Sequence, residues 1–381
     1  MARHPLSEKI VIAGVGATQF GALPGRSTVS MIVEAAAAAL YDAGIEKALI
    51  DAVLVKPPTS NPEMMFQVSV SEALGLQPKL NPNWNQGGAA NIAMITYAAL
   101  SIEAGLCDIA LLCFADNPKT GSRRAYGQAK GNDAVFGFSG TLGQYGMIAR
   151  RHIEQYGTRT DHLGAVAVAC RRHGSVNPAA QLRKPLTLDE YRASKPMVAP
   201  FRREDACLVS DGGAALIVMS AARARELKVP RPVPVLGFGQ GQTAWEPYLR
   251  PDLTTTQAVV SGQTAFAMAG LSPRDIDIAQ LYDCFTIVPI MTLEDYGFCK
   301  KGEGGPFSAD GRLEIDGDLP MNTAGGLLSE TGMPGMQLVI EGVRQMRGEA
   351  NLQAKRARNC IISNQGGIMQ THSTLILGER L

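Results

Sequence analysis

An internal repeat constrains the fold of this chain more than any other feature of its sequence. Val233–Gly241 (VPVLGFGQG) echoes Val11–Ala17, and Met268–Ile278 (MAGLSPRDIDI) echoes Leu40–Ile50 in the same order. The offset between matching segments grows along the chain, as it would if loops had been inserted between them. Self-similarity of this kind indicates two copies of one structural unit.

Short apolar strands alternate with helices within each copy. In the first copy, strands are expected at Lys9–Gly14, Asp51–Lys56 and Asp108–Phe114, and a further strand runs into Trp84. The segments between these strands have the composition of helices. The alternation predicts an α/β layered fold of two halves, each with a mostly parallel sheet.

The texture of the sequence changes between residues 117 and 200, where glycines and prolines interrupt the helical pattern. A long irregular segment inside a compact domain usually covers a site. We therefore predict an inserted loop or cover domain at 117–200. The first half of the repeat then comprises 1–116 and 201–232, and the second half comprises 233–381.

The bulk composition argues against several classes of protein. With 381 residues and 45% hydrophobic side chains, the chain can bury two or three linked cores. Its 36 Lys and Arg against 35 Asp and Glu predict no binding to nucleic acid or to an acidic membrane. No apolar run is long enough for a membrane span. The seven cysteines lack metal-site spacing, so we expect no metal, and they fit a reducing cytoplasm.

A glycine-rich helix start is the first candidate site. Asn85 offers a helix cap, and Gly87 and Gly88 remove side chains just before an Ala-rich apolar run. Backbone N–H groups and the positive end of the helix dipole would stabilise a thioester carbonyl, an enolate or a phosphate there. The alternative is that these glycines only let the helix pack tightly against a strand.

The second half repeats this pattern. Asn322 is followed by Gly325 and Gly326 and then by a helix expected at Met336–Met346. Two copies of one unit would bring the two glycine-rich helix starts face to face near the centre of the molecule. That pseudo-symmetric junction is where we expect substrate to bind.

Two strand ends in the second half carry groups that could transfer protons. Tyr282 and Cys284 lie on one face of an extended segment, and either could donate or accept a proton if its neighbours tuned it. Asn364 lies near the glycine turn of the last repeat strand, on the same face as Cys360. A buried Tyr with packed cysteines is the alternative reading. None of the five histidines lies in these clusters, so a hydrolase triad is unsupported.

Taken together, these positions resemble the thiolase superfamily, in particular the branch of sterol-carrier-protein-x-like thiolases and lipid-transfer-protein aldolases. The resemblance runs nearly end to end. It is carried by the opening VIAGVGATQFG, SerAspGlyGlyAla at 210–214, TyrAspCysPhe at 282–285, Asn322-x-x-Gly325-Gly326 and the final GlnGlyGly at 365–367. The resemblance implies a thiolase-like fold of two αβαβα layered halves.

The chain departs from the thiolase pattern at the residues that carry acyl transfer. Gly88 occupies the place of the nucleophilic cysteine, and GlyMetPro at 332–334 replaces a Gly-His-Pro motif. Tyr282 stands where thiolases of this branch have His in a His-Asp-Cys-Phe motif. Glycine has no side chain to acylate, so the covalent route is lost. The lipid-transfer aldolases resemble the chain at Tyr282, but they carry a second Tyr near Gly332.

The resemblance therefore implies an enzyme that cleaves or forms a C–C bond next to a CoA thioester without acyl transfer. Tyr282 and Cys284 would move protons, while Asn85, Gly88, Asn322, Gly325, Gly326 and Asn364 would line the pocket. Two alternatives stay open. One is an acyltransferase that uses Cys284 or Cys360 as nucleophile, and the other is a non-catalytic subunit that binds acyl-CoA or lipid.

The resemblance also implies partners. We expect no cofactor other than coenzyme A as part of the substrate. We expect a homodimer built across the sheet of the first half, and a small companion protein with an oligonucleotide-binding-like fold and a zinc ribbon.

Overall fold

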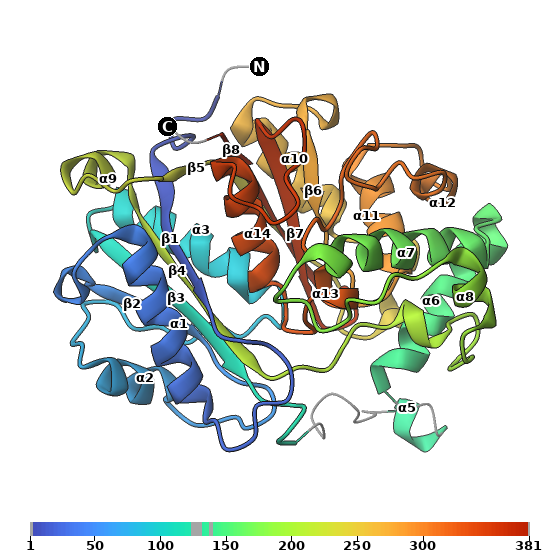
Figure 1. Ribbon diagram of the computed structural model, residues 1–381, viewed down its shortest axis with the longest axis horizontal. Helices are drawn as coiled ribbons and strands as arrows, with labels where there is room; N and C mark the ends of the chain where they lie inside the picture. The colour runs from blue at the N-terminus through green and yellow to red at the C-terminus, as the bar shows by residue number, and fades with distance from the viewer. Residues whose placement is uncertain (1–2, 123–131, 137–139, 380–381) are drawn as a thin grey trace.

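A single mixed sheet runs through the computed structural model, which describes residues 3–122, 132–136 and 140–379 (Figure 1). Within these residues eight strands are joined in the order β2-β3-β4-β1-β5-β8-β7-β6. The strands are β1 (Ile10–Ala17), β2 (Ala52–Lys56), β3 (Ile109–Asp116), β4 (Gly212–Ser220), β5 (Val233–Gln242), β6 (Ile278–Gln280), β7 (Asn359–Gly366) and β8 (Thr371–Gly378).

The two halves of this sheet have the same topology. The order β2-β3-β4-β1 in the first half mirrors β6-β7-β8-β5 in the second. The halves meet where β1 and β5 pair antiparallel, with Val11 opposite Pro234 and Ile12 opposite Val233. The structure therefore contains the two copies of one unit that the sequence repeat predicts.

The predicted mostly parallel sheet is wrong, because among the eight described strands β2–β3 and β6–β7 pair in parallel and the other neighbours pair antiparallel. Within each half, the antiparallel pairings arise from one strand, β4 or β8, which no crossover helix joins to a parallel neighbour. β4 returns from the insertion and lies between β3 and β1, antiparallel to both. β8 follows β7 through a hairpin, which can only join antiparallel strands.

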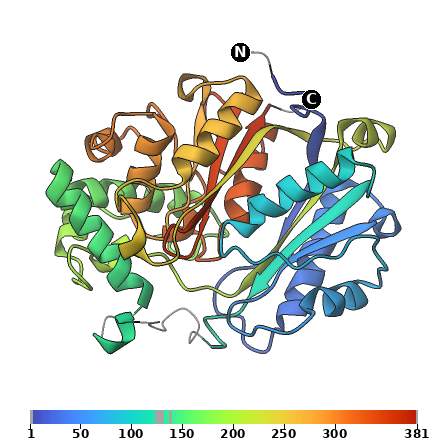
Figure 2. The same ribbon diagram turned by 180° about the vertical axis from the view of Figure 1, so that it is seen from behind.

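Helices complete a layered arrangement. α1 (Thr28–Ala43) and α2 (Phe66–Leu74) cover the outer face of the first half, and α10 (Ala258–Ala269) covers β5 and β8 of the second, with α11 (Ile287–Tyr296) packed on it. α3 (Ala90–Glu103) and α14 (Met336–Arg347) contact strands of both halves and form the central layer, as the views from front and back show (Figures 1 and 2).

Alternate residues of the strands face different cores. Ile12 packs into the large core that includes α3 and the second half, whereas Val11 and Ala13 pack into the core beneath α1 and α2. This period of two is what a strand buried on both faces requires. The central helices are thus packed mainly by apolar side chains, although Glu341 in the middle of α14 accepts a hydrogen bond from Thr323.

The predicted insertion is largely helical where it is described. It contains α5 (Asn132–Val135), α6 (Gly140–Tyr156), α7 (Thr160–Val176) and α8 (Leu188–Ala193), while residues 123–131 and 137–139 lie outside the described residues. α7 packs on α12 (Gly304–Ser308) and α13 (Gly326–Ser329) of the second half, and α8 packs on α7. α9 (Ala221–Glu226) leads from β4 toward β5. The exact domain boundaries stay a prediction.

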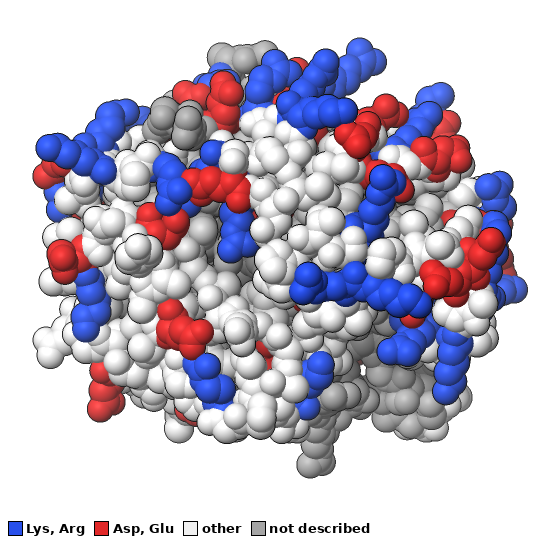
Figure 3. All heavy atoms as spheres, in the orientation of Figure 1, with Lys and Arg blue, Asp and Glu red and all other residues white. Residues whose placement is uncertain are grey.

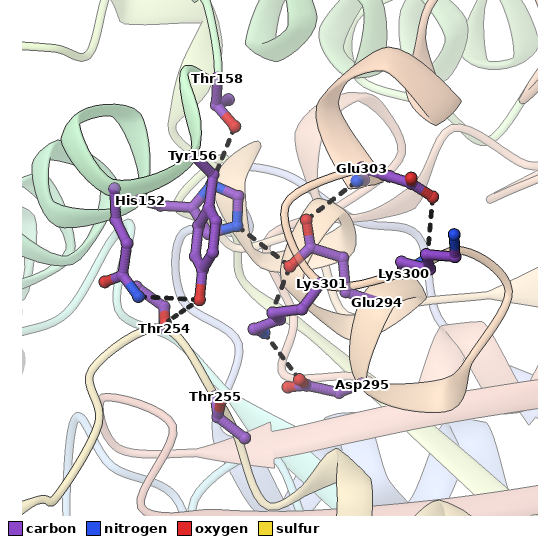
Figure 4. A network of polar contacts seen from close by, with 12 residues as sticks. His152, Tyr156, Thr158, Thr254, Thr255, Glu294, Asp295, Lys300, Lys301 and Glu303 are labelled. Atoms are coloured by element: carbon purple, nitrogen blue, oxygen red, sulfur yellow. Dashed lines mark hydrogen bonds and ion pairs between the residues drawn. The ribbon is translucent and has the colours of Figure 1, made fainter.

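A buried polar network fastens the insertion to the second half (Figure 4). His152 of α6 contacts Thr158 at 2.9 Å and Glu294 of α11 at 3.1 Å. Lys301 forms ion pairs with Glu294 at 3.2 Å and with Asp295 at 2.8 Å. The position of α6, and of any site residue that it carries, is therefore set by buried hydrogen bonds as well as by apolar packing.

The surface agrees with the near-neutral composition. On the face shown in Figure 3, Lys and Arg are interspersed with Asp and Glu rather than gathered by sign. Among the described residues, no helix combines the length and apolarity that crossing a membrane requires.

Candidate active site

The start of α3 and the side chain of Tyr282 meet at the centre of the molecule. A Cβ placed on Gly88 would lie 2.6 Å from the hydroxyl oxygen of Tyr282 and 2.4 Å from the carbonyl oxygen of Gln365. Both distances are below any normal contact of a methyl group. The phenol of Tyr282 therefore fills the space into which a side chain at position 88 would project.

The backbone before α3 packs directly on the end of β7. A Cβ on Gly87 would lie 2.8 Å from Cα of Gly366, and a Cβ on Gly366 would lie 1.9 Å from the carbonyl oxygen of Gln86. Only glycine permits this approach of two backbones. The tight-packing interpretation of Gly87 and Gly88 is correct, and the same packing brings the helix start to Tyr282.

Asn85 does not cap this helix, contrary to the prediction. α3 begins at Ala90, its N-cap is Ala89, and no side chain accepts a hydrogen bond from its first turn. Asn85 lies upstream on an exposed loop. The two glycines separate Asn85 from the helix, so its side chain is too far along the chain to act as an N-cap.

Tyr282, Asp283 and Cys284 follow β6, and hydrogen bonds to the main chain fix their course. The backbone N–H of Tyr282 donates to the hydroxyl of Ser363 at 3.0 Å. Asn322 accepts from the N–H of Leu281 at 2.7 Å and donates to its carbonyl at 2.8 Å. Both polar atoms of the Asn322 side chain are thus used to hold the segment, which gives Asn322 a positioning role.

The backbone that follows Gly325 and Gly326 binds the side chain of Asp283. The N–H of Leu327 donates to Asp283 at 2.8 Å, and a Cβ on Gly326 would lie 2.3 Å from the same carboxylate. The four-residue helix α13 begins here, and the predicted longer helix follows separately as α14. The N–H groups of Leu327 and Leu328 are thus occupied by a buried carboxylate, and the N–H of Gly325 donates to the carbonyl of Asn322 at 2.8 Å. That Gly325 and Gly326 line the substrate pocket stays a prediction.

The counterpart of Gly88 in the second half is Gly335, directly before α14. A Cβ on Gly335 would lie 2.3 Å from the side-chain oxygen of Asn364, and Asn364 donates to the carbonyl of Gly335 at 3.2 Å. Asn91 of α3 donates to the carbonyl of Pro334. The two central helix starts therefore do meet, and Asn364 lies at their junction.

Cys284 lies in a buried polar cluster that the sequence did not reveal. Its sulfur accepts a hydrogen bond from Nε2 of Gln365 at 3.3 Å and also interacts with the hydroxyl of Tyr145 from α6. Gln365 donates to Tyr145 at 2.9 Å. Burial raises the pKa of the Cys284 thiol to about 12. Tyr145 belongs to a helix of the insertion, and nothing in its local pattern marks it as a partner of Cys284.

Comparison with known proteins identifies the family. The family model described as Thiolase C-terminal domain-like matches residues 239–379. The steroid side-chain-cleaving aldolase of Thermomonospora curvata is 35% identical, and the match covers 96% of this chain and 97% of that protein. The 17-hydroxy-3-oxo-4-pregnene-20-carboxyl-CoA lyase of Mycobacterium tuberculosis is 35% identical over 98% of this chain and 100% of its own. The chain belongs to the thiolase superfamily.

A solved relative agrees with this assignment. The Ltp2-ChsH2(DUF35) aldolase superposes with a TM-score of 0.88 at 34% identity, covering 98% of both chains. The predicted thiolase-like fold and the predicted branch, which includes lipid-transfer aldolases, are confirmed.

The segment Gly332-Met333-Pro334 differs from the thiolase pattern in its backbone packing as well as in its sequence. A Cβ on Gly332 would lie 1.7 Å from the carbonyl oxygen of Leu208, so no side chain fits at this position with the present backbone. Met333 is buried. The second Tyr that the resemblance associates with this region therefore has no equivalent at Gly332, and another part of the chain must supply any second phenol.

Cys360 is remote from this site. It begins the buried part of β7 opposite Ile278 and Leu377, at the other end of the strand from Asn364. It has no exposed surface, and burial raises the pKa of its thiol well above the usual value. The alternative in which Cys360 attacks a thioester is therefore wrong on grounds of access.

Proposed function

We propose that this thiolase-superfamily protein is an acyl-CoA lyase that cleaves, or in reverse forms, the C–C bond next to a CoA thioester. The observation that carries the proposal is the Tyr282 hydroxyl beside Gly88, where a side chain of residue 88 would otherwise project. A proton-transfer group thus stands at the start of the central helix. The names of the two relatives at 35% identity support the same class of reaction.

The proposed reaction is a retro-aldol cleavage of a β-hydroxyacyl-CoA. Tyr282, as the phenolate, takes the proton of the β-hydroxyl group. The bond between C2 and C3 breaks, C3 becomes a ketone carbonyl, and the bonding electrons form the enolate of the shortened thioester. Cys284 then protonates C2, and the proton held by Tyr282 returns to the sulfur. The proton count closes without any other reactant.

The start of α3 can stabilise both anions of the proposed reaction, the phenolate of Tyr282 and the enolate. The positive end of a helix dipole stabilises negative charge in the first turn. When Tyr282 takes up its proton, it becomes neutral and the enolate becomes negative, so the net charge beside Gly88 stays constant. A preorganised field that need not rearrange during the reaction lowers its barrier.

The alternative of acyl transfer through Cys284 is less favoured. A thiol whose pKa is raised to about 12 holds its proton at neutral pH, and the thiolate is the nucleophilic form. The same property suits a thiol that donates a proton. A binding subunit without catalysis is the remaining alternative.

Incubation of the purified full chain with 17-hydroxy-3-oxo-4-pregnene-20-carboxyl-CoA separates these possibilities. Lyase activity gives a ketone and a shortened acyl-CoA without a covalent adduct on the protein. Acyl transfer gives an intact-protein mass increased by the acyl group. Saturable binding with neither product would leave only the binding subunit.

We also propose the remaining features of the predicted assembly. The solved relative's name, Ltp2-ChsH2(DUF35) aldolase, supports a small companion protein, and the predicted homodimer stays part of the proposal. A cytoplasmic location is supported by the seven cysteines, which are all free thiols. Size-exclusion chromatography with light scattering tests the dimer, and co-expression with a candidate companion tests its effect on turnover.

A further inference from the structure

Tyr145 joins three segments of the candidate site. Its ring lies 4.6 Å from that of Phe285, between centroids, and its hydroxyl donates to the carbonyl of Gly367 at 3.2 Å. The same hydroxyl accepts from Gln365 and interacts with the sulfur of Cys284. Only 1% of the Tyr145 side chain is exposed. This phenol is the contribution of the inserted helix α6 to the site.

The hydroxyl of Tyr145 has two alternative acceptors. A phenol carries one proton and can accept hydrogen bonds as well. While Cys284 keeps its proton, the Tyr145 hydroxyl donates to the carbonyl of Gly367. Once the sulfur has lost its proton, a charged acceptor lies beside the same hydroxyl, and hydrogen bonds to charged acceptors are the stronger ones.

We propose that Tyr145 is a positioning residue for Cys284, which turns its O–H toward the sulfur when the thiol gives up its proton and so makes Cys284 the second proton donor of the site. Gln365 provides the other N–H to the sulfur. The role of the thiol in catalysis rests on the proposed function, whereas the hydrogen bond itself does not. Tyr145 thereby supplies the second phenol for which the backbone at Gly332 leaves no room.

The step balances in atoms and charge. The S–H bond of Cys284 breaks, a C–H bond forms at C2 of the enolate, and the electron pair stays on sulfur. The thiolate is then held by the O–H of Tyr145 and the N–H of Gln365 until Tyr282 returns the proton. The negative charge passes from the enolate to sulfur, so the donors around sulfur decide how readily the thiol acts as an acid.

Other titratable groups around these two side chains have to be considered in any pH experiment. Those that interact electrostatically with Cys284 or Tyr145 come from several elements, namely Asp283, Cys207, Tyr282 and Arg250. Arg250 is the cation of this set and favours the ionised form of Tyr145, Asp283 disfavours a thiolate at Cys284, and a thiolate at Cys284 would in turn disfavour one at Cys207.

The test measures the reactivity of Cys284 without any substrate. Methyl methanethiosulfonate reacts with thiolates, and peptide mass spectrometry separates Cys284 from the other six cysteines. At fixed pH, Tyr145→Phe is expected to slow labelling of Cys284 roughly tenfold, because one hydrogen bond to the charged form is lost. Tyr156→Phe is the matched control on the same helix, since its hydroxyl contacts Thr254 instead. An unchanged or faster rate in Tyr145→Phe overturns the proposal.

A second variant covers the case in which Tyr145→Phe does not fold. Difluorotyrosine introduced at position 145 keeps the shape of the ring and strengthens the O–H donor, so labelling of Cys284 should become faster. A slower or unchanged rate contradicts the hydrogen bond. In turnover, Tyr145→Phe should lower kcat about tenfold while KM changes less than about twofold. Altered labelling without any cleavage would refute the proposed function alone, and cleavage with unaltered labelling would refute this inference alone.

Discussion

The hydroxyl oxygen of Tyr282 lies 2.6 Å from the point at which a side chain of Gly88 would begin. A side chain at position 88 and the phenol of Tyr282 would therefore occupy the same space. In a chain that carried a nucleophile at position 88, Tyr282 could not adopt its present place. This steric exclusion links the two differences from the thiolase pattern, Gly88 in place of Cys and Tyr282 in place of His.

Replacement of Gly88 by alanine should disturb both the fold and the site. The added methyl group meets Tyr282 and the backbone of Gln365, and neither can withdraw without moving its segment. We expect a loss of about 1–3 kcal/mol in the free energy of unfolding, together with a large fall in turnover. Urea unfolding and steady-state assays measure the two effects.

Gly146→Ala is the matched control for that experiment. Gly146 lies in α6, and its added Cβ would meet only a methyl group of Val198 closely, at 3.3 Å. Alanine also favours a helix over glycine. Its free energy of unfolding should stay within about 1 kcal/mol of the wild-type value. Equal stability of Gly88→Ala and wild type would contradict the crowding at the start of α3.

Removal of the Tyr282 hydroxyl should separate catalysis from binding. In Tyr282→Phe the ring keeps its packing but the proton-transfer group is gone, so kcat should fall about 100-fold or more. The Kd for a non-cleavable acyl-CoA that lacks the β-hydroxyl group should stay within about twofold, because uniform binding is unaffected. Isothermal titration calorimetry and product analysis provide the two values.

Tyr41→Phe serves as its control, because Tyr41 is 90% exposed and far from the site in sequence and in packing. Turnover of this variant should equal that of the wild type. If Tyr282→Phe kept full turnover as well, Tyr282 would have no part in proton transfer.

The repeat in the sequence predicts the architecture well, because strands and helices follow local periodicity. The repeat does not predict which residues contact each other when they come from segments far apart in the sequence. The pattern Asn322-x-x-Gly325-Gly326 looks like that of Asn85 to Gly88, yet the N–H groups that directly follow it, those of Leu327 and Leu328, bind Asp283. The direction of β4 and β8 depends on how the chain returns to the sheet, which residue spacing does not encode.

Candidate residues near the strand ends could be found from sequence, since Tyr282 and Cys284 alternate on one face as expected. Tyr145 and Gln365 could not be assigned to them. Tyr145 reaches Cys284 from an inserted helix whose placement depends on the buried network of His152, Glu294 and Lys301. Such a network joins residues that are far apart in the sequence, so no local pattern predicts it.

A buried carboxyl group should make stability depend on pH. Glu330 is 3% exposed, and burial together with the nearby Glu341 raises the pKa of its side chain to about 8. The folded protein then holds a proton that the unfolded chain releases above its ordinary pKa of 4.5. The stabilisation is complete below that value and is lost as pH rises through about 8.

Glu330→Gln should remove this dependence. One oxygen of Glu330 accepts from Asn177 at 3.2 Å and the other has no hydrogen-bond partner, so an amide fits in its place. The wild type should lose up to about 1.4 kcal/mol per pH unit over this range relative to the variant. Urea unfolding at acidic, neutral and alkaline pH measures the slope. Glu46→Gln, at an exposed position, should leave the slope as it is in the wild type. Parallel curves for the wild type and Glu330→Gln would show that Glu330 ionises as a surface group does.

The ion pairs of Lys301 lie within the second half and should hold Glu294 in the place where it contacts His152 of the insertion (Figure 4). The side chains of Glu294 and Asp295 are 0% and 2% exposed, and Lys301 pairs with both. Lys301→Met leaves two buried carboxyl groups without their cation, which should lower the free energy of unfolding by about 3 kcal/mol. It should also impair turnover, because α6 carries Tyr145. Lys300→Met is the control, since Lys300 is exposed and its ammonium forms no ion pair with any described residue. Urea unfolding of both variants measures the difference, and similar stability of the two would mean that the ion pairs of Lys301 add nothing to the stability of this network.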